Sequence, residues 1–126
     1  MRRLVFAGAL IALATPAALA DAQSEIVQAE THAGLAAKAT DVAVVHQHLH
    51  HALNCLVGPG GVSFDAKEMN PCANAGNGAI PDSMDATKKT ALQAAADQLS
   101  TTIAETDADK ARQGATKAAD MLKAAE

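Results

Sequence analysis

The sequence predicts an all-α fold, a small three- or four-helix bundle with a long disulfide-tied loop between its two helical halves. Alanine, the strongest helix former, recurs along the whole chain. β-branched residues are sparse outside one segment, 42–57, which argues against a large sheet. Aromatic residues make up only 2% of the chain, with no Trp or Tyr, so close packing of helices over small side chains must supply much of the stability.

The first twenty residues have the pattern of an export signal. Arg2 and Arg3 give a basic start, residues 4–14 form an apolar run, and residues 18–20 form a small-x-small cleavage site. The apolar run is too short for a spanning helix and is followed at once by the cleavage pattern, although an uncleaved anchor is the alternative. Residues 1–20 are therefore predicted to be a signal peptide, and residues 21–126 a single helical domain that is periplasmic or secreted.

The charge balance excludes some partners of the exported domain. The net charge of the whole chain is −4 with neutral histidines, and loss of Arg2 and Arg3 makes it −6. Nucleic acids and anionic membrane surfaces are bound by basic patches, so neither is an expected partner after cleavage. The alanine-rich surfaces leave a homodimer open.

Helix signals divide the domain into four segments. Asp21 to Ser24 offers capping residues for the first, and Thr40-Asp41 either caps a second helix or lies inside one long helix; a break is favoured. Pro81-Asp82-Ser83 predicts the start of the third, whose apolar stripe includes Met84, and Thr106 or Asp107 caps the fourth. The expected helices are 24–39, 41–57, 82–105 and 107–125, and the last two form an antiparallel hairpin.

Residues 58–81 form the predicted loop, which begins with the breaker sequence Gly58-Pro59-Gly60-Gly61. A connection of this length in a small domain is normally tied down or functional. Two cysteines in an exported chain are most simply paired, so Cys55 and Cys72 are predicted to form a disulfide that pins the loop to the preceding helix. The alternative is that Cys55 is a free thiolate in a soft-metal site.

The segment 42–57 holds four of the chain's five histidines, and on a helix they divide between two faces. His46 and His50 lie on one flank of the apolar stripe, whereas His48, His51 and Cys55 project roughly opposite to it. The stripe itself is the expected core face and consists of Val42, Val45, Leu49, Leu53 and Leu56.

Histidines four residues apart on a helix can bind one divalent ion, and imidazole suits copper, nickel and zinc. His46 and His50 are therefore the first candidate ligands. Two ligands are too few for tight binding, so more must come from Met84, a neighbouring carboxylate, a bridged dimer or the other histidines, namely His32, His48 and His51. The segment predicts a transition-metal site with Cu, Ni or Zn as the ion.

The predicted function is sequestration or delivery of that metal, without catalysis. No His-Glu-x-x-His protease motif is present because Gln47 follows His46, and the glycines at 58–61 are not followed by the Lys-Ser/Thr of a phosphate-binding loop. The alternative function is that of a periplasmic interaction or stress protein. Its histidines would be structural or pH-sensing, with His46 and His50 hydrogen-bonded to neighbouring helices and His48 and His51 solvated.

Overall fold

A computed structural model describes residues 21–126, and the predicted signal peptide lies outside the described residues. The described part contains five helices and no strand, which confirms the predicted all-α class. Four of the helices are long and one, α3, is a single short turn between the two halves of the bundle. The helices are α1 (Ala22–Lys38), α2 (Val42–Val57), α3 (Ala79–Asp82), α4 (Ala86–Ile103) and α5 (Ala108–Ala125).

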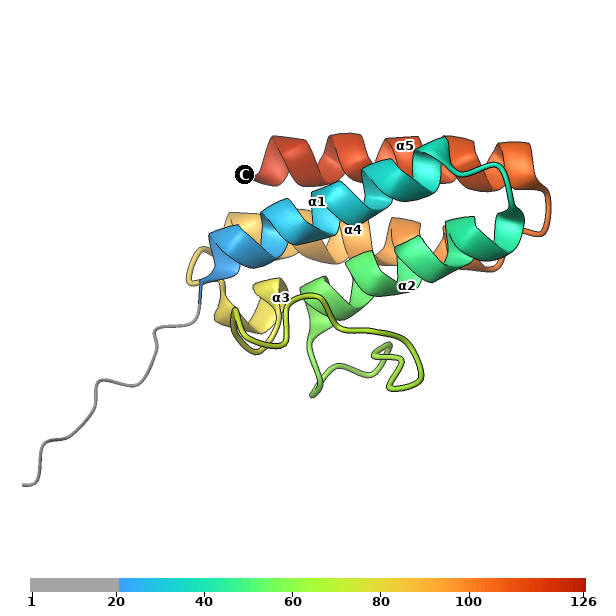
Figure 1. Cartoon of the computed structure of the whole chain (residues 1–126). Coiled ribbons are helices and arrows are strands. Elements are labelled where there is room, and N and C mark those ends of the chain that lie inside the picture. Colours follow the sequence, from blue (N-terminus) through green and yellow to red (C-terminus); the bar gives the residue numbers. More distant parts are fainter. Residues whose placement is uncertain (1–20) are drawn as a thin grey trace, which may run out of the picture.

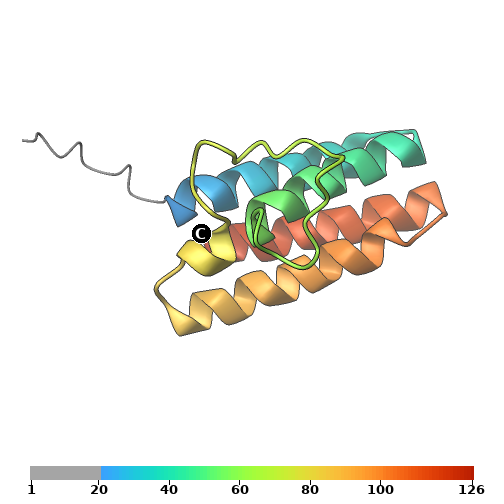
Figure 2. The same ribbon diagram turned by 90° about the horizontal axis from the view of Figure 1, so that it is seen from below.

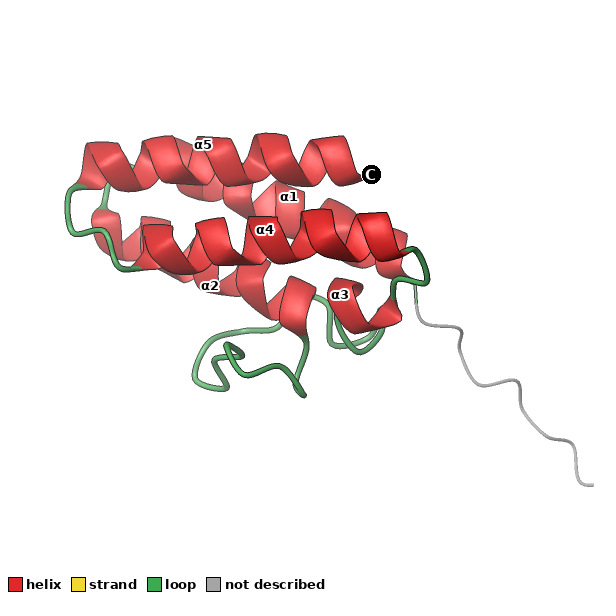
Figure 3. Cartoon of the chain, turned by 180° about the vertical axis from the view of Figure 1, so that it is seen from behind, coloured by secondary structure: helices red, strands yellow, loops and turns green. Residues whose placement is uncertain are grey.

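The four long helices alternate in direction and form a four-helix bundle (Figure 1). α1 and α2 form one antiparallel hairpin, and α4 and α5 form the second (Figure 3). α1 packs against α2 and α5, whereas α4 packs against α2 and α5 from the other side. The short helix α3 closes one end of the bundle, where it contacts α1, α2 and α4.

An aspartate caps the N-terminus of every long helix. The carboxylates of these residues accept backbone N–H groups at 2.6 to 3.1 Å, which satisfies donors that the first turn leaves free. Asp41 is one of them, and the backbone is extended at Ala39 and at Asp41, so residues 22–57 form two helices, as the predicted break requires. The four caps are Asp21, Asp41, Asp85 and Asp107.

Removal of one of these caps gives a small and measurable effect. Asp107→Ala should lower the free energy of unfolding by about 1 kcal/mol, because the N–H of Lys110 loses its acceptor at the start of α5. Chemical denaturation measures the change. Asp120→Ala on the exposed face of the same helix is the matched control and should change stability by less than about 0.5 kcal/mol. Equal effects of the two substitutions would contradict the capping role.

The third long helix starts later than the sequence predicted. Instead of opening it, Asp82 ends the short helix α3, and its carboxylate accepts the N–H of Asn77 at 2.6 Å. Ser83 is extended, and α4 begins at Ala86 under the cap of Asp85. Met84 is consequently 98% exposed in the link between α3 and α4, so its assignment to the apolar stripe is wrong.

The core is built from leucines separated by alanines. Fully buried leucines come from α2, α4 and α5, and buried alanines on all four long helices let the backbones approach closely. α4 and α5 come so close that a Cβ placed on Gly114 would lie 2.4 Å from the hydroxyl of Thr102. The largest aliphatic side chains in this core are Ile26, Leu49, Leu56, Leu92, Leu99 and Leu122.

The loop between the two halves leaves α2 and returns to nearly the same point. Gly58 has a φ of +66°, and a Cβ there would lie 1.6 Å from the carbonyl oxygen of Asn77, so only glycine fits where the two ends of the loop meet. The predicted disulfide between Cys55 and Cys72 is present and ties the loop to α2. Figure 2 shows this loop folded along the side of the bundle.

None of the helices in residues 21–126 combines the length and the apolar composition that crossing a bilayer requires.

Candidate metal centre

Three histidines from two helices converge at the seam between α1 and α2. His32 comes from α1, and His48 and His51 come from α2. One ring nitrogen from each residue lies within 4.8 Å of the other two, and the Nδ1 atoms of His32 and His48 are 3.2 Å apart. We call these three residues the histidine triad. Their ring centroids are 5.1 to 5.7 Å apart, so the three imidazoles lie side by side.

The short turn between α1 and α2 explains why these residues meet. His32 lies eight residues before Thr40 and His48 lies eight residues after it. In an antiparallel hairpin with its turn centred at Thr40, these two positions face each other across the seam. His51 follows His48 by three residues, so it lies on the same side of α2.

Burial favours the neutral form of two triad residues, His32 and His51, and a neutral imidazole keeps one ring lone pair. Burial lowers the pKa of His32 to about 4, and the neighbouring charges of His51 and His48 add to the effect. Burial also lowers the pKa of His51, with a further contribution from His48, although the nearby Glu68 acts in the opposite direction. Because metal ligands must be deprotonated, neutral imidazoles at neutral pH suit binding.

His51 has one ring nitrogen without a hydrogen-bond partner. Its Nδ1 atom is buried and unpartnered, and the residue is only 5% exposed. Its other nitrogen, Nε2, lies 3.5 Å from the Oε2 atom of Glu68. A buried polar atom without a partner is costly, and a metal ion at the triad would supply a partner for His51. The Nδ1 atom of His50, which lies outside the triad, is likewise buried without a hydrogen-bond partner.

The spacing of the triad fits a transition metal. A tetrahedral ion with metal to nitrogen distances of about 2.0 to 2.1 Å holds its ligand nitrogens about 3.3 to 3.4 Å from one another. The Nδ1 atoms of His32 and His48 are already at 3.2 Å. The ligand atom of His51 lies within 4.8 Å of both, so the triad could hold one ion after His51 moves closer, with a fourth position left open.

His46 and His50, the first candidate ligands from the sequence, lie outside the triad. His46 donates from Nε2 to the carbonyl oxygen of Glu105 at 2.7 Å, in the link between α4 and α5. The Nδ1 atom of His50 lies 3.5 Å from the Oδ2 atom of Asp65 in the loop. His46 thus has a hydrogen-bond partner of its own, whereas Nδ1 of His50 contacts Asp65 without forming a hydrogen bond. His32 lies against the face of α2 that carries His48 and His51.

The face of α2 opposite the aliphatic stripe is covered. His51 and Cys55 are both buried, because α1 and the loop pack over them, so the reading of His51 as solvated is wrong. The thiolate alternative for Cys55 is also wrong because its sulfur is bonded to Cys72. The sequence pattern of α2 alone could not reveal this cover, since both covering segments come from elsewhere in the chain.

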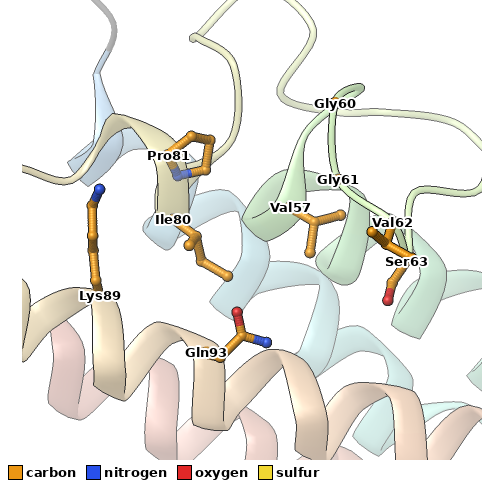
Figure 4. Close-up of a pocket in the computed structure, with 9 residues that line it drawn as sticks. All are labelled: Val57, Gly60, Gly61, Val62, Ser63, Ile80, Pro81, Lys89 and Gln93. Carbon is orange, nitrogen blue, oxygen red and sulfur yellow. The ribbon is translucent and has the colours of Figure 1, made fainter.

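A groove of about 500 Å³ lies in another part of the bundle (Figure 4). It is bordered by the end of α2, the start of the loop, α3 and α4, and its polar side chains include Lys89 and Gln93. No histidine lines it. The groove and the histidine triad are therefore separate features.

Within residues 21–126, the triad is the group of histidine, cysteine or acidic side chains whose ligand atoms can converge on a single ion. It combines two imidazoles with lowered pKa values, a buried unpartnered nitrogen and an adjacent carboxylate. Comparisons of the chain with protein-family models, with curated proteins and with solved structures find no match, so its function has to be argued from this geometry.

Proposed function

We propose that this protein binds one transition-metal ion, Cu(II), Ni(II) or Zn(II), through His32, His48 and His51. The observation that carries the proposal is the convergence of three imidazole nitrogens within 4.8 Å of one another across the seam between α1 and α2. Imidazole is a preferred ligand of all three metals.

The number of protein ligands at the triad favours a role in carrying or buffering metal over a role of the metal in holding the fold together. Structural zinc sites close the coordination shell with four protein ligands, whereas the triad offers three. The bundle also has its own leucine and alanine core and a disulfide, so we expect it to fold without an ion. An ion with one open position can pass to another protein by ligand exchange, which fits sequestration or delivery without catalysis.

An exported location fits the same proposal. The disulfide between Cys55 and Cys72 hints at an oxidising compartment, where such bonds persist. The pattern of residues 1–20 independently predicts export.

The test is a comparison of two pairs of histidine substitutions. Equilibrium dialysis against Cu(II), Ni(II) and Zn(II) should show one ion per chain, and His32→Ala/His48→Ala should weaken binding by more than about 100-fold. Removal of a residue that only contacts a ligand typically weakens metal affinity about 10- to 100-fold, so removal of two ligands should weaken it more. Both residues are partly exposed, so their removal should leave the bundle folded.

His46→Ala/His50→Ala is the matched control, since it removes two histidines of the same helix that lie outside the triad. Its metal affinity should stay within about threefold of the unsubstituted protein. Loss of binding in this control alone would show that His46 and His50, and not the triad, bind the metal. Absence of binding by the unsubstituted protein below high micromolar metal would refute the proposed function.

A further inference from the structure

The part of the loop from Asp65 to Cys72 lies against α2 and brings two carboxylates to two consecutive histidines. The Oδ2 atom of Asp65 is 3.5 Å from Nδ1 of His50, and the Oε2 atom of Glu68 is 3.5 Å from Nε2 of His51. The two contacts have equal length, but only His51 belongs to the histidine triad. The two carboxylates can therefore be compared directly.

Asn54 fixes this part of the loop in place. Its buried side-chain amide donates to the carbonyl oxygens of Asp65 at 3.0 Å and Met69 at 3.2 Å, and its Oδ1 atom accepts the N–H of Asp65 at 2.9 Å. The next residue, Cys55, is bonded to Cys72 at the far end of the segment. Glu68 thus lies between two points of attachment and stays beside His51.

The position of Glu68 decides which nitrogen of His51 carries the proton. An ionised carboxylate only accepts hydrogen bonds, so it favours a proton on the nitrogen that faces it, Nε2. In a neutral imidazole the lone pair then resides on Nδ1. Nδ1 is the buried atom that has no hydrogen-bond partner.

We propose that Glu68 is a positioning residue of the metal site: it holds His51 in the Nε2–H form and orients its ring so that Nδ1 binds the metal. Glu68 does not itself bind the ion. This inference rests on the proposed function and extends it to a residue of the loop. Metal-binding histidines commonly donate their second N–H group to a carboxylate, which fixes the ring and makes it a better ligand.

The experiment compares Glu68→Gln and Glu68→Ala with Asp65→Asn, the matched control on His50. Titration with Cu(II) and Zn(II) in competition with a chromogenic chelator measures affinity. Glu68→Ala should weaken binding about 10- to 100-fold, the usual effect of removing such a carboxylate. Glu68→Gln should fall between Glu68→Ala and the unsubstituted protein, because its Oε1 atom can still accept the proton of Nε2. Asp65→Asn should stay within about threefold.

The proton position is read separately, by two-bond ¹H–¹⁵N NMR of the metal-free protein. His51 should be in the Nε2–H form, and Glu68→Ala should shift it towards Nδ1–H or a mixture, which a merely structural role of Glu68 would not do. This readout does not require metal binding, so it distinguishes failure of the inference from failure of the proposed function. Unchanged affinity and unchanged proton position in Glu68→Ala would overturn the inference, as would a loss in Glu68→Ala as large as that in His51→Ala.

Discussion

Glu25→Gln should stabilise the protein by up to about 3 kcal/mol at pH 8.5 and have little effect at pH 4. Glu25 is fully buried in the first turn of α1, where its Oε1 atom accepts the N–H of Gly78 at 2.8 Å and its Oε2 atom has no partner. Burial raises the pKa of Glu25 from 4.5 to about 7, and the nearby negative charge of Asp82 adds to this although the Gly78 hydrogen bond opposes it.

The direction of the pH effect follows from this pKa. The folded protein holds the proton of Glu25 more tightly than the unfolded chain does, so the stability linked to this proton is complete below pH 4.5 and is lost as pH rises through about 7. A shift from 4.5 to about 7 corresponds to about 3 kcal/mol at about 1.4 kcal/mol per pH unit. Glutamine cannot ionise and keeps an acceptor for Gly78, so it escapes this penalty.

Denaturant unfolding of the metal-free protein and its Glu25→Gln variant at pH 4 and pH 8.5 measures the effect. The low pKa of His32, about 4, acts in the opposite direction, because its contribution to stability is lost as pH falls from 6.5 towards 4. Comparison of variant with unsubstituted protein at each pH cancels that term. Asp120→Asn, an exposed carboxylate of α5, is the control and should show no such pH dependence. A loss of stability in Glu25→Gln at pH 8.5 would contradict the prediction.

Cys55→Ala/Cys72→Ala should lower the free energy of unfolding by about 3 kcal/mol. The disulfide closes a segment with a sequence separation of 17, and cross-links of this span restrict the unfolded chain by about that amount. In addition, the variant should bind metal more weakly than the intact protein. The segment that carries Glu68 would then lose its covalent attachment to α2 and keep only the hydrogen bonds of Asn54 and the side-chain contacts with His50 and His51.

Urea unfolding with and without a reducing agent measures the contribution of the disulfide. The reductant should move the midpoint of the unsubstituted protein to that of the double variant and leave the variant itself unchanged. A difference below about 1 kcal/mol between the oxidised protein and the variant would show that the loop is held mainly by its other contacts.

The parts of the fold that depend on local signals could be predicted from the sequence. The caps at Asp41 and Asp107 place helix starts correctly because an aspartate satisfies the first N–H groups wherever a helix begins. The prediction that Asp82 starts a helix was wrong, because its carboxylate accepts the N–H of Asn77 in a turn that the sequence does not reveal. The residue that caps α4 is Asp85, whose carboxylate accepts the N–H of Lys88.

The candidate site could be predicted in its residue type but not in its grouping. Spacing along one helix favoured His46 and His50, because periodicity describes neighbours on a single helix and says nothing about the partner helix. The triad depends on the pairing of α1 with α2. His32 and His48 are each eight residues from Thr40 in the sequence. If the turn at Thr40 is short, this equal separation places the two residues opposite each other.

The role of Glu68 had no signal in the sequence. It is separated from His51 by the breaker glycines and an irregular stretch of loop, whose path depends on the disulfide and on Asn54. Such contacts follow from tertiary structure and cannot be obtained from local patterns.

Gly58 and Asn77 contact each other at the base of the loop, so the chain enters and leaves the loop at the same place on the bundle. Because its ends already touch, residues added at the exposed position Val62 should leave the spacing of the four long helices unaltered. Each doubling of loop length costs only about 0.6 kcal/mol in closure entropy. The part of the loop around Val62 can therefore vary in length while the bundle and the attached segment that carries Glu68 remain the same.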